Sequence, residues 1–407
     1  MTRSLEQIVI SPAELARFGT GTTLADQAHG LLAQQKGVWE MLRNGYDTLR
    51  TVQTRVFDFD RFHIKVQFNP GRMTSTVAKV DATSIKERKC FLCLENLPPA
   101  QRGLACEADY LVLCNPFPIF PEHFTISCLR HTPQLIRHSL AAFLKITRDL
   151  GARYLVLYNG PRCGASAPDH LHFQAGNRSS LPLDAEFESM KAACAARLFE
   201  SAAVRVWSVE NCLRHFFTFE SANAGALEQS FAALYAVLQE GGPADEEPML
   251  NILGFHTRDE WRIHVFPRAK HRPSFYFLEG EEKLLISPAA VELGGICTTP
   301  READFAKVTR EHIVELYREV CVAPERFADL KTRLAAHPRD FCSGPPRAGR
   351  CVLPGPLSRL HLMRGHRLSR SLPQPTRGAR DALRHRDRPC RNGASRTRDR
   401  RGDRPRA

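Results

Sequence analysis

The chain has 407 residues, and its composition excludes two broad classes of protein. No stretch reaches the roughly 18 consecutive apolar residues that a transmembrane helix needs, and the start MTRSLEQIVISPAE lacks the long apolar region of a secretory signal. Thirteen scattered cysteines, an odd number, favour reduced thiols. We therefore expect a cytoplasmic protein without membrane contacts, long enough for two domains of ~150 residues each.

The net charge of +13 comes from one end of the chain. Residues 341–407 contain 18 Arg, no Lys, four Asp and no Glu, whereas the preceding 340 residues carry 39 basic and 40 acidic side chains. This segment has one aromatic residue and cannot build a core. We expect residues 339–407 to form a basic disordered tail, and the loss of Lys favours an out-of-frame translation of GC-rich DNA. Electrostatic binding of nucleic acid is the alternative for the tail, and it is not expected elsewhere.

The first half of the chain has the pattern of alternating strands and helices. We expect a helix over 22–50, a strand over 56–70, two strands around a Pro-rich turn in 110–127, a helix over 132–150 with Thr132 as its cap, and a buried strand over 154–158.

A second set of similar elements follows from about residue 200. Residues 214–221 have the pattern of a strand, residues 227–241 that of an amphipathic helix, and residues 249–255 and 260–268 that of a hairpin. This order repeats the first half without its histidine motif.

The segment APDHLHFQAG, residues 167–176, places polar side chains at every second position. Strand alternation predicts His170, His172 and Gln174 on one face, with two apolar side chains on the other. A buried strand rarely presents three polar groups on one face, because each needs a partner. An amphipathic surface strand is the alternative, and we disfavour it because the upstream residues also resemble a site.

Those upstream residues form a loop of small side chains. A strand ends at Asn159, and Gly164-Ala165-Ser166 leads into the histidine segment. Small residues let backbone N–H groups approach an anion, and a Ser hydroxyl adds a donor. A plain hairpin loop is the alternative. Together with two histidines, the loop indicates phosphoryl or nucleotidyl chemistry.

The pattern Asn159, Gly164-x-Ser166, Pro168 and His170-x-His172-x-Gln174 resembles the active-site segment of galactose-1-phosphate uridylyltransferases. These enzymes belong to the histidine-triad superfamily, with GDP-hexose phosphorylases and dinucleoside-tetraphosphate phosphorylases. HLHFQA and QFNPGR, residues 170–175 and 67–72, are most similar to the GDP-hexose phosphorylase branch, and the likeness runs from about residue 25 to 335, closest to a bacterial branch.

The resemblance implies the fold and the domain organisation. It implies an α+β class with two histidine-triad-like halves, each an antiparallel sheet with packed helices. The first half, residues 1–195, would be catalytic, and the second, residues 196–338, would not.

The resemblance also implies the chemistry. His172 would attack the α-phosphorus and carry the nucleotide, Gln174 would donate to a phosphoryl oxygen, and His170 would orient the site. Gln cannot protonate a leaving group, which favours transfer over hydrolysis. We expect a phosphorylase that cleaves an NDP-sugar with phosphate through a nucleotidyl-histidine. The alternatives are a dinucleoside-polyphosphate phosphorylase and a catalytically silent nucleotide-binding protein.

Cys90-Phe-Leu-Cys93 has the spacing of a zinc knuckle. The resemblance supplies two further ligands, so that Cys90, Cys93, His131 and His170 would hold a structural Zn²⁺. Two reduced core cysteines are the alternative, and His123 is a competing ligand. No organic cofactor is expected.

Several cations could hold the phosphates of a substrate, since Arg grips phosphate at two points. Arg72 and Lys79 precede the Cys pair, and Arg268 and Lys270 follow the hairpin of the second half. Each could equally be an ordinary surface cation. We expect substrate contacts from Asn159, Gly164, Ser166, Arg72, Lys79, Arg268 and Lys270. Homodimerisation is left open.

Overall fold

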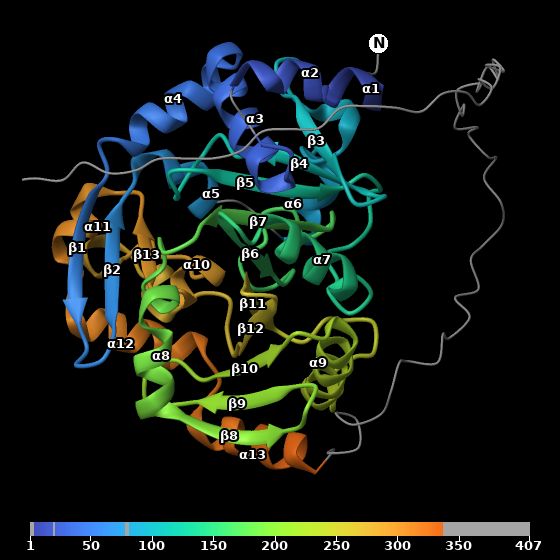
Figure 1. The fold of residues 1–407 in the computed structure, drawn as a ribbon. Coiled ribbons are helices and arrows are strands. Elements are labelled where there is room, and N and C mark those ends of the chain that lie inside the picture. Colours follow the sequence, from blue (N-terminus) through green and yellow to red (C-terminus); the bar gives the residue numbers. More distant parts are fainter. Residues whose placement is uncertain (1–3, 19–20, 78–80, 337–407) are drawn as a thin grey trace, which may run out of the picture. The chain divides into compact units, whose positions relative to one another are not determined.

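A computed structural model describes residues 4–18, 21–77 and 81–336 of the chain (Figure 1). The expected basic tail, residues 339–407, lies outside the described residues, and so does Lys79. No helix in the described ranges is long and apolar enough to cross a membrane.

Ten strands of the described chain form one sheet. They are β3 (Gly103–Cys106), β4 (Tyr110–Cys114), β5 (His123–Cys128), β6 (Tyr154–Asn159), β7 (His172–Asn177), β8 (Ala195–Glu200), β9 (Arg205–Val209), β10 (Phe216–Ser221), β11 (Leu250–Thr257) and β12 (Glu260–Pro267). Their order is β3-β4-β5-β7-β6-β11-β12-β10-β9-β8, and all neighbours are antiparallel.

The strand order shows that the sheet consists of two equivalent halves. From the two edges inward, β3-β4-β5-β7-β6 and β8-β9-β10-β12-β11 follow the same order, and they join where β6 pairs with β11. A helix connects the third and fourth strands in sequence of each half, α7 (Leu140–Leu150) in the first and α9 (Ala224–Gln239) in the second. The predicted α+β fold with two antiparallel halves is confirmed, and the halves share one sheet. The division into domains at residues 195 and 338 stays a prediction.

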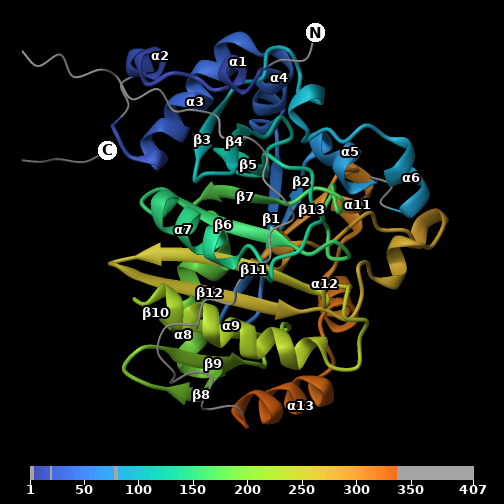
Figure 2. The ribbon, with the colours of Figure 1, turned by 90° about the vertical axis from the view of Figure 1, so that its right-hand side faces the viewer.

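Helices cover one face of this sheet. They are α3 (Leu24–Val38), α7, α9 and α13 (Pro324–Ala335), and the core beneath them includes Phe143, Phe173, Phe231 and Phe327. In Figure 1, α7 and α9 lie to the right of the sheet, and Figure 2 shows them in front of it.

A smaller sheet packs toward the opposite face. It has the order β1-β2-β13, with β1 (Gln53–Asp58) antiparallel and β13 (Ile296–Thr299) parallel to β2 (His63–Phe68). The apolar core of this side joins side chains of β2, β6, β11 and β12. Segments more than 200 residues apart in sequence therefore pair as neighbouring strands.

The remaining elements are short or peripheral. They are α1 (Leu5–Ile8), α2 (Pro12–Leu15), α4 (Glu40–Leu49), α5 (Met73–Thr76), α6 (Ala82–Glu87), α8 (Pro182–Cys194), α10 (Ala290–Leu293), α11 (Glu302–Lys307) and α12 (Arg310–Val320), with 3₁₀ turns η1 (Ala16–Phe18), η2 (Pro70–Arg72), η3 (Leu94–Asn96), η4 (Ser274–Tyr276) and η5 (Gly280–Glu282).

Two predicted elements are divided in the structure. The helical stretch 22–50 breaks at Trp39, whose φ of −115° and ψ of 101° are extended. The stretch 56–70 is not one strand: the chain reverses at Asp60, with a φ of 58°, and forms the β1–β2 hairpin. Apolar periodicity does not register a tight turn whose flanking residues continue the alternation.

The predicted helix over 132–150 begins only at Leu140. The backbone carbonyl of Thr132 accepts from Leu171 N–H, and Gln134 N–H donates to the Pro168 carbonyl. This segment therefore runs beside the loop before β7, and its backbone groups are not available for a helix. The predicted strand 214–221, helix 227–241 and hairpin of 249–268 are confirmed as β10, α9 and β11–β12.

Candidate functional site

The histidine segment differs from its prediction at its first residue. β7 begins at His172, whereas His170 lies in a turn in which its N–H donates to the Ala167 carbonyl at 3.1 Å. The expectation that His170, His172 and Gln174 share one strand face is therefore wrong for His170. His172 and Gln174 do share a face, and both line a cavity.

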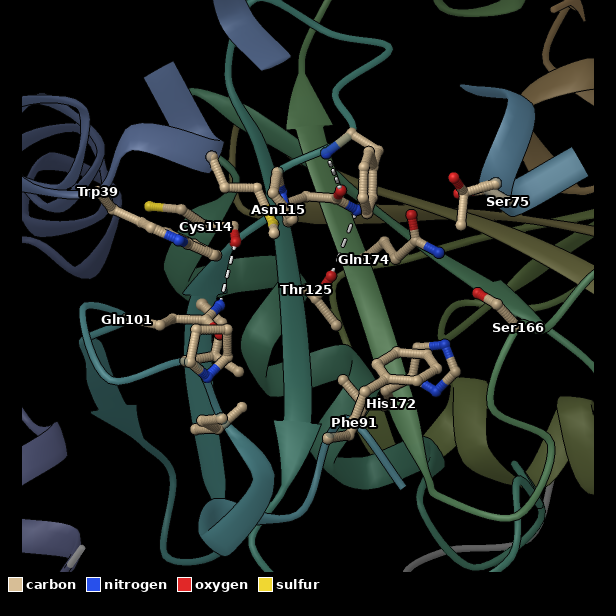
Figure 3. A pocket seen from close by; sticks show the side chains of 18 of the residues that line it. Trp39, Ser75, Phe91, Gln101, Cys114, Asn115, Thr125, Ser166, His172 and Gln174 are labelled. Atoms are coloured by element: carbon tan, nitrogen blue, oxygen red, sulfur yellow. Dashed lines mark hydrogen bonds between the residues drawn. The ribbon is translucent and has the colours of Figure 1, made fainter. Parts of the chain in front are cut away.

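The cavity has a volume of about 630 Å³ and lies over the first half of the sheet (Figure 3). Its wall comes from β4, β5 and β7, from the segment after Trp39, from residues 72–75 and from the loop around the Cys pair. Its apolar lining includes Trp39, Leu97, Pro98, Leu113 and Cys114, and Figure 3 shows Trp39 and Cys114 toward one end. Figure 3 shows His172, Gln174, Ser75 and Ser166 toward the other end, so the cavity has an apolar and a polar part.

The hydrogen bonds of His172 determine its tautomer. Its Nδ1 lies 2.8 Å from the His170 carbonyl, which can only accept, so Nδ1 carries the proton. Its backbone N–H donates to Gln134 Oε1 at 2.8 Å. Burial lowers the pKa of His172 to about 4, so the ring is neutral near pH 7. The Nε2 lone pair has no hydrogen-bond donor among the described residues and is left to the cavity.

Gln174 lies beside His172 on the same strand face. Its side-chain oxygen is 2.8 Å from Nε2 of His123, a buried residue at the start of β5. Thr125, its cross-strand neighbour on β5, also lines the cavity. His172 and Gln174 therefore present one nucleophilic nitrogen and one amide to the same space.

Four side chains form the predicted metal cluster. The ligand atoms of Cys90, Cys93, His131 and His170 all lie within 4.8 Å of one another. His170 Nδ1 is 3.4 Å from Cys90 Sγ and 3.6 Å from Cys93 Sγ, and His131 Nδ1 is 3.2 Å from Cys93 Sγ. Tetrahedral zinc, with bonds of about 2.0 Å to N and about 2.3 Å to S, would hold such ligand atoms about 3.5 Å apart. The set fits a metal ion.

The outer nitrogens of both cluster histidines have oxygen partners. His170 Nε2 is 2.7 Å from the Cys128 carbonyl, and His131 Nε2 is 3.7 Å from Asp169 Oδ2. A carbonyl acceptor places the His170 proton on Nε2 and leaves Nδ1 free to ligate, as is usual at metal sites. His123, the competing ligand, is not part of this cluster.

The cluster also forms part of the cavity wall. Phe91 and Leu92, between the two cysteines, line the cavity, as does Arg88. Arg88 pairs with Asp169 at 2.5 Å. The loop that carries the Cys pair therefore also shapes the cavity that His172 lines.

Of the predicted substrate contacts, Arg72 and Ser166 line the cavity. Arg72 donates to the Phe117 carbonyl at 2.8 Å. Gly164 has a φ of 95°, and a Cβ there would lie 2.6 Å from that of Ala289, so this glycine allows the loop to pack against the second half. Asn159 is buried at the end of β6, outside the cavity wall.

The predicted cations of the second half do not reach the cavity. Arg268 is buried and donates to Asn251 Oδ1 and to the backbone carbonyls of Val320, Pro288, Lys270 and His271. Lys270 pairs with Glu319 at 2.7 Å. Neither lines the cavity. Sequence reasoning missed several residues that do line it: Trp39, Arg88, Phe91, Gln101, Asn115 and Thr125. Of these, Arg88 and Phe91 lie beside or within the Cys pair, so that motif could have pointed to them.

The second half has His264 where the first half has Gln174. Gln174 lies between Thr125 and a leucine on the neighbouring strands, and His264 lies in the same way between Thr218 and a leucine. His264 is fully buried, and its ring packs against the rings of Phe187, Phe216 and Phe255. Aromatic side chains therefore occupy the space that corresponds to the cavity.

Two family models match the chain, one on each half of the sheet. Residues 31–177 match a domain of unknown function, DUF4922, and residues 185–338 match the family described as GDPGP1-like, C-terminal domain. None of the curated protein sequences matches the chain.

Solved structures are similar at low identity. Yeast Ap4A phosphorylase Apa2 in complex with AMP has 18% identity and a TM-score of 0.43, with 70% of this chain and 98% of that chain covered. A DUF4931 family protein from Bacillus cereus has 13% identity and a TM-score of 0.33, with coverage of 59% and 100%. A uridylyltransferase has 12% identity and a TM-score of 0.30, with coverage of 58% and 88%.

The family matches agree with the sequence motif. The DUF4922 match ends at residue 177, the last residue of β7, and the GDPGP1-like match contains β8 to β12. The GDP-hexose phosphorylase branch is also the one to which HLHFQA is most similar. The second half of the chain therefore matches the GDPGP1-like C-terminal domain, in agreement with the resemblance that the histidine motif of the first half shows.

Proposed function

We propose that the protein is a nucleotidyltransferase of the phosphorylase type, which cleaves an NDP-sugar with inorganic phosphate through a nucleotidyl-His172 intermediate. The observation that carries the proposal is the tautomer of His172. Its Nδ1 proton is held by the His170 carbonyl, and its Nε2 lone pair faces the cavity beside the Gln174 amide. A buried neutral imidazole in this tautomer is a ready nucleophile.

The reaction proceeds in two displacements. In the first, Nε2 of His172 attacks the α-phosphorus, the P–N bond forms, and the bond to the β-phosphate oxygen breaks, which releases a sugar 1-phosphate. In the second, an oxygen of inorganic phosphate attacks the same phosphorus, the P–N bond breaks, and NDP leaves. A sugar phosphate leaves as an anion and needs no proton, so an amide at position 174 suffices.

Other groups of the cavity would bind the substrate. The ring of Trp39 offers a flat wall for a nucleobase, and the end with His172 offers hydroxyls of Ser75 and Ser166 for phosphates; the cation of Arg72 also lines the cavity. Hydrogen bonds to a charged phosphate are stronger than neutral ones and are suited to hold it in line with His172.

We propose further that Cys90, Cys93, His131 and His170 hold a structural zinc ion. Zinc would supply cross-linking and no chemical step, since all four ligands come from protein side chains. It would connect the Cys loop to the turn before β7 and thereby position the His172 backbone.

The test is phosphate-dependent release of NDP from a panel of NDP-sugars, with diadenosine tetraphosphate as the competing substrate. With an α-³²P-labelled substrate and no phosphate, the wild type should retain label on the protein that is stable in base and labile in acid, as expected of a phosphoramidate. His172→Ala should give neither label nor NDP and should remain folded.

His138→Ala is the matched control, because His138 is exposed and does not line the cavity. It should be labelled as the wild type is. Label on His172→Ala, or turnover by this variant near the wild-type rate, would refute the proposal. If the protein turns over only diadenosine tetraphosphate, the proposed His172 intermediate stands, but the substrate is a dinucleoside polyphosphate and not an NDP-sugar.

A further inference from the structure

The hydrogen bonds of His123 connect the candidate site to a backbone amide outside it. His123 begins β5 and is fully buried. Its Nδ1 lies 3.1 Å from the backbone nitrogen of Ile119, and its Nε2 lies 2.8 Å from Oε1 of Gln174. Both ring nitrogens therefore have one partner each.

These two partners allow a single arrangement of protons. A backbone N–H can only donate, so His123 Nδ1 must accept from Ile119 and carries no proton. The neutral ring then has its proton on Nε2, which must donate to Gln174. The partner atom of Gln174 is consequently its oxygen, since its NH₂ group would place two donors face to face.

The orientation of Gln174 follows from this arrangement. With Oε1 held by His123, the NH₂ group of Gln174 is the part of the amide left for the cavity, and Figure 3 shows that nitrogen on the side of Ser166. An amide turned over would present its oxygen to a phosphoryl oxygen and repel it. Packing alone does not select between the two orientations, because the oxygen and the NH₂ group of the amide have nearly the same shape. A hydrogen bond must therefore fix the amide.

We propose that His123 is a positioning residue for nucleotidyl transfer: it holds the amide of Gln174 with the NH₂ group toward the transferred phosphoryl group. The inference rests on the proposed function. His123 does not line the cavity and would act only through Gln174.

The surroundings of His123 keep its ring neutral. Burial and the neighbouring Arg72 cation lower the pKa of His123 to about 3. Protonation would also set an Nδ1 proton against the Ile119 N–H. The orientation of Gln174 is therefore maintained throughout the ordinary pH range.

Two substitutions separate the two bonds of His123. In His123→Asn, the amide oxygen can still accept from Ile119 N–H, but no atom reaches Gln174. In His123→Gln, the longer side chain brings an NH₂ group to the place of Nε2 and can donate to Gln174. We expect kcat to fall about fivefold in His123→Asn, the effect of one lost hydrogen bond, and to recover toward the wild type in His123→Gln. KM for phosphate should stay the same in both.

A double-mutant cycle distinguishes positioning from general loss of structure. In a Gln174→Ala background, His123→Asn should have no further effect on kcat, because the group that it positions is gone. An equal loss in both backgrounds, or wild-type kcat in His123→Asn, would overturn the inference. Either result would leave the His172 intermediate untouched, since its labelling is measured separately.

A second measurement does not depend on turnover. NMR of protein labelled with ¹⁵N-histidine should show His123, assigned by the signal missing in His123→Gln, as the Nε2–H tautomer without titration from about pH 5.5 to about pH 8.5. An Nδ1–H tautomer, or a ring that titrates in this range, would refute the positioning role even if the protein has no phosphorylase activity.

Discussion

The chemistry of the candidate site depends on which nitrogen of each histidine carries a proton. Backbone carbonyls fix Nδ1–H in His172 and Nε2–H in His170, and a backbone N–H fixes Nε2–H in His123. Neighbouring imidazoles are thus prepared for different tasks: in the proposed mechanism His172 would be the nucleophile, His170 a metal ligand and His123 a donor to Gln174. Backbone atoms set the position of the proton in each ring, and a substitution of a neighbouring side chain does not remove them.

Gln174→Ala should lower kcat about 10²-fold, in the range measured for the loss of one donor to a developing charge. The reason is that the amide is the donor next to His172 on the same strand face. Steady-state kinetics with the substrate identified by the panel would measure it. His172 should still become labelled, more slowly. A variant with unchanged kcat would remove Gln174 from the mechanism.

At the scale of elements, the Cys loop and the turn before β7 form one unit. Phe91 and Leu92 lie between the two metal-cluster cysteines and line the cavity, and His170 lies two residues before His172. A bound ion would therefore stabilise the cavity wall and the start of β7 together. In the second half, Phe187, Phe216 and Phe255 surround His264 and fill the space that corresponds to the cavity.

The purified protein should contain about one zinc equivalent per chain. Cys90→Ser should lose the metal and lower Tm by several degrees, because the binding energy of structural zinc is partly folding energy. The chemical step should change less, since no ligand is the nucleophile. Metal analysis and thermal unfolding would measure both.

Cys106→Ser is the matched control for this experiment, because Cys106 is a buried thiol outside the cluster. It should keep its zinc. Zinc-free protein with full stability and activity would leave Cys90 and Cys93 as reduced core cysteines.

At the scale of the whole molecule, one sheet carries both halves, and buried histidines are distributed over both. Burial lowers the pKa of His123 to about 3 and that of His271 to about 4, and the pKa of His264 lies well below its ordinary value. In the unfolded chain these rings would titrate near pH 6.5.

We expect the free energy of unfolding to decrease as the pH falls below about 6.5, by about 1.4 kcal/mol per pH unit for each such histidine. The unfolded state binds these protons first, so the stabilisation present at neutral pH is lost progressively, down to about pH 4 for His271 and to about pH 3 for His123. Urea unfolding at several pH values would measure the slope. His123→Gln should reduce it and His138→Ala should not; a slope identical in all three proteins would contradict the assignment.

Removal of residues 341–407 should leave stability and turnover unchanged. The last described helix, α13, ends at Ala335, and the first 340 residues are nearly neutral without the segment. Thermal unfolding and kinetics of the shortened chain would test this. Aggregation or loss of most activity would show that the segment belongs to the fold, and salt-sensitive RNA binding by the full chain alone would support a basic arm.

The sequence by itself determined the features that depend on local pattern. Alternation predicted β10 and the β11–β12 hairpin, apolar periodicity predicted α9, and the histidine motif predicted the superfamily and placed His172 and Gln174 on one face. The spacing of Cys90 and Cys93, with two histidines supplied by the family likeness, predicted the cluster that the structure brings together.

Only the tertiary structure decided which atoms face one another across strands. His170 lies outside the predicted strand, in a turn that places it at the Cys pair. Arg268, predicted to contact substrate, is buried and donates to carbonyls of the second half. Trp39 and Asn115 reached the cavity from segments that have no motif. The physical reason is that tautomers, buried hydrogen bonds and cavity walls depend on distances between residues far apart in the chain, and local periodicity contains no information about those distances.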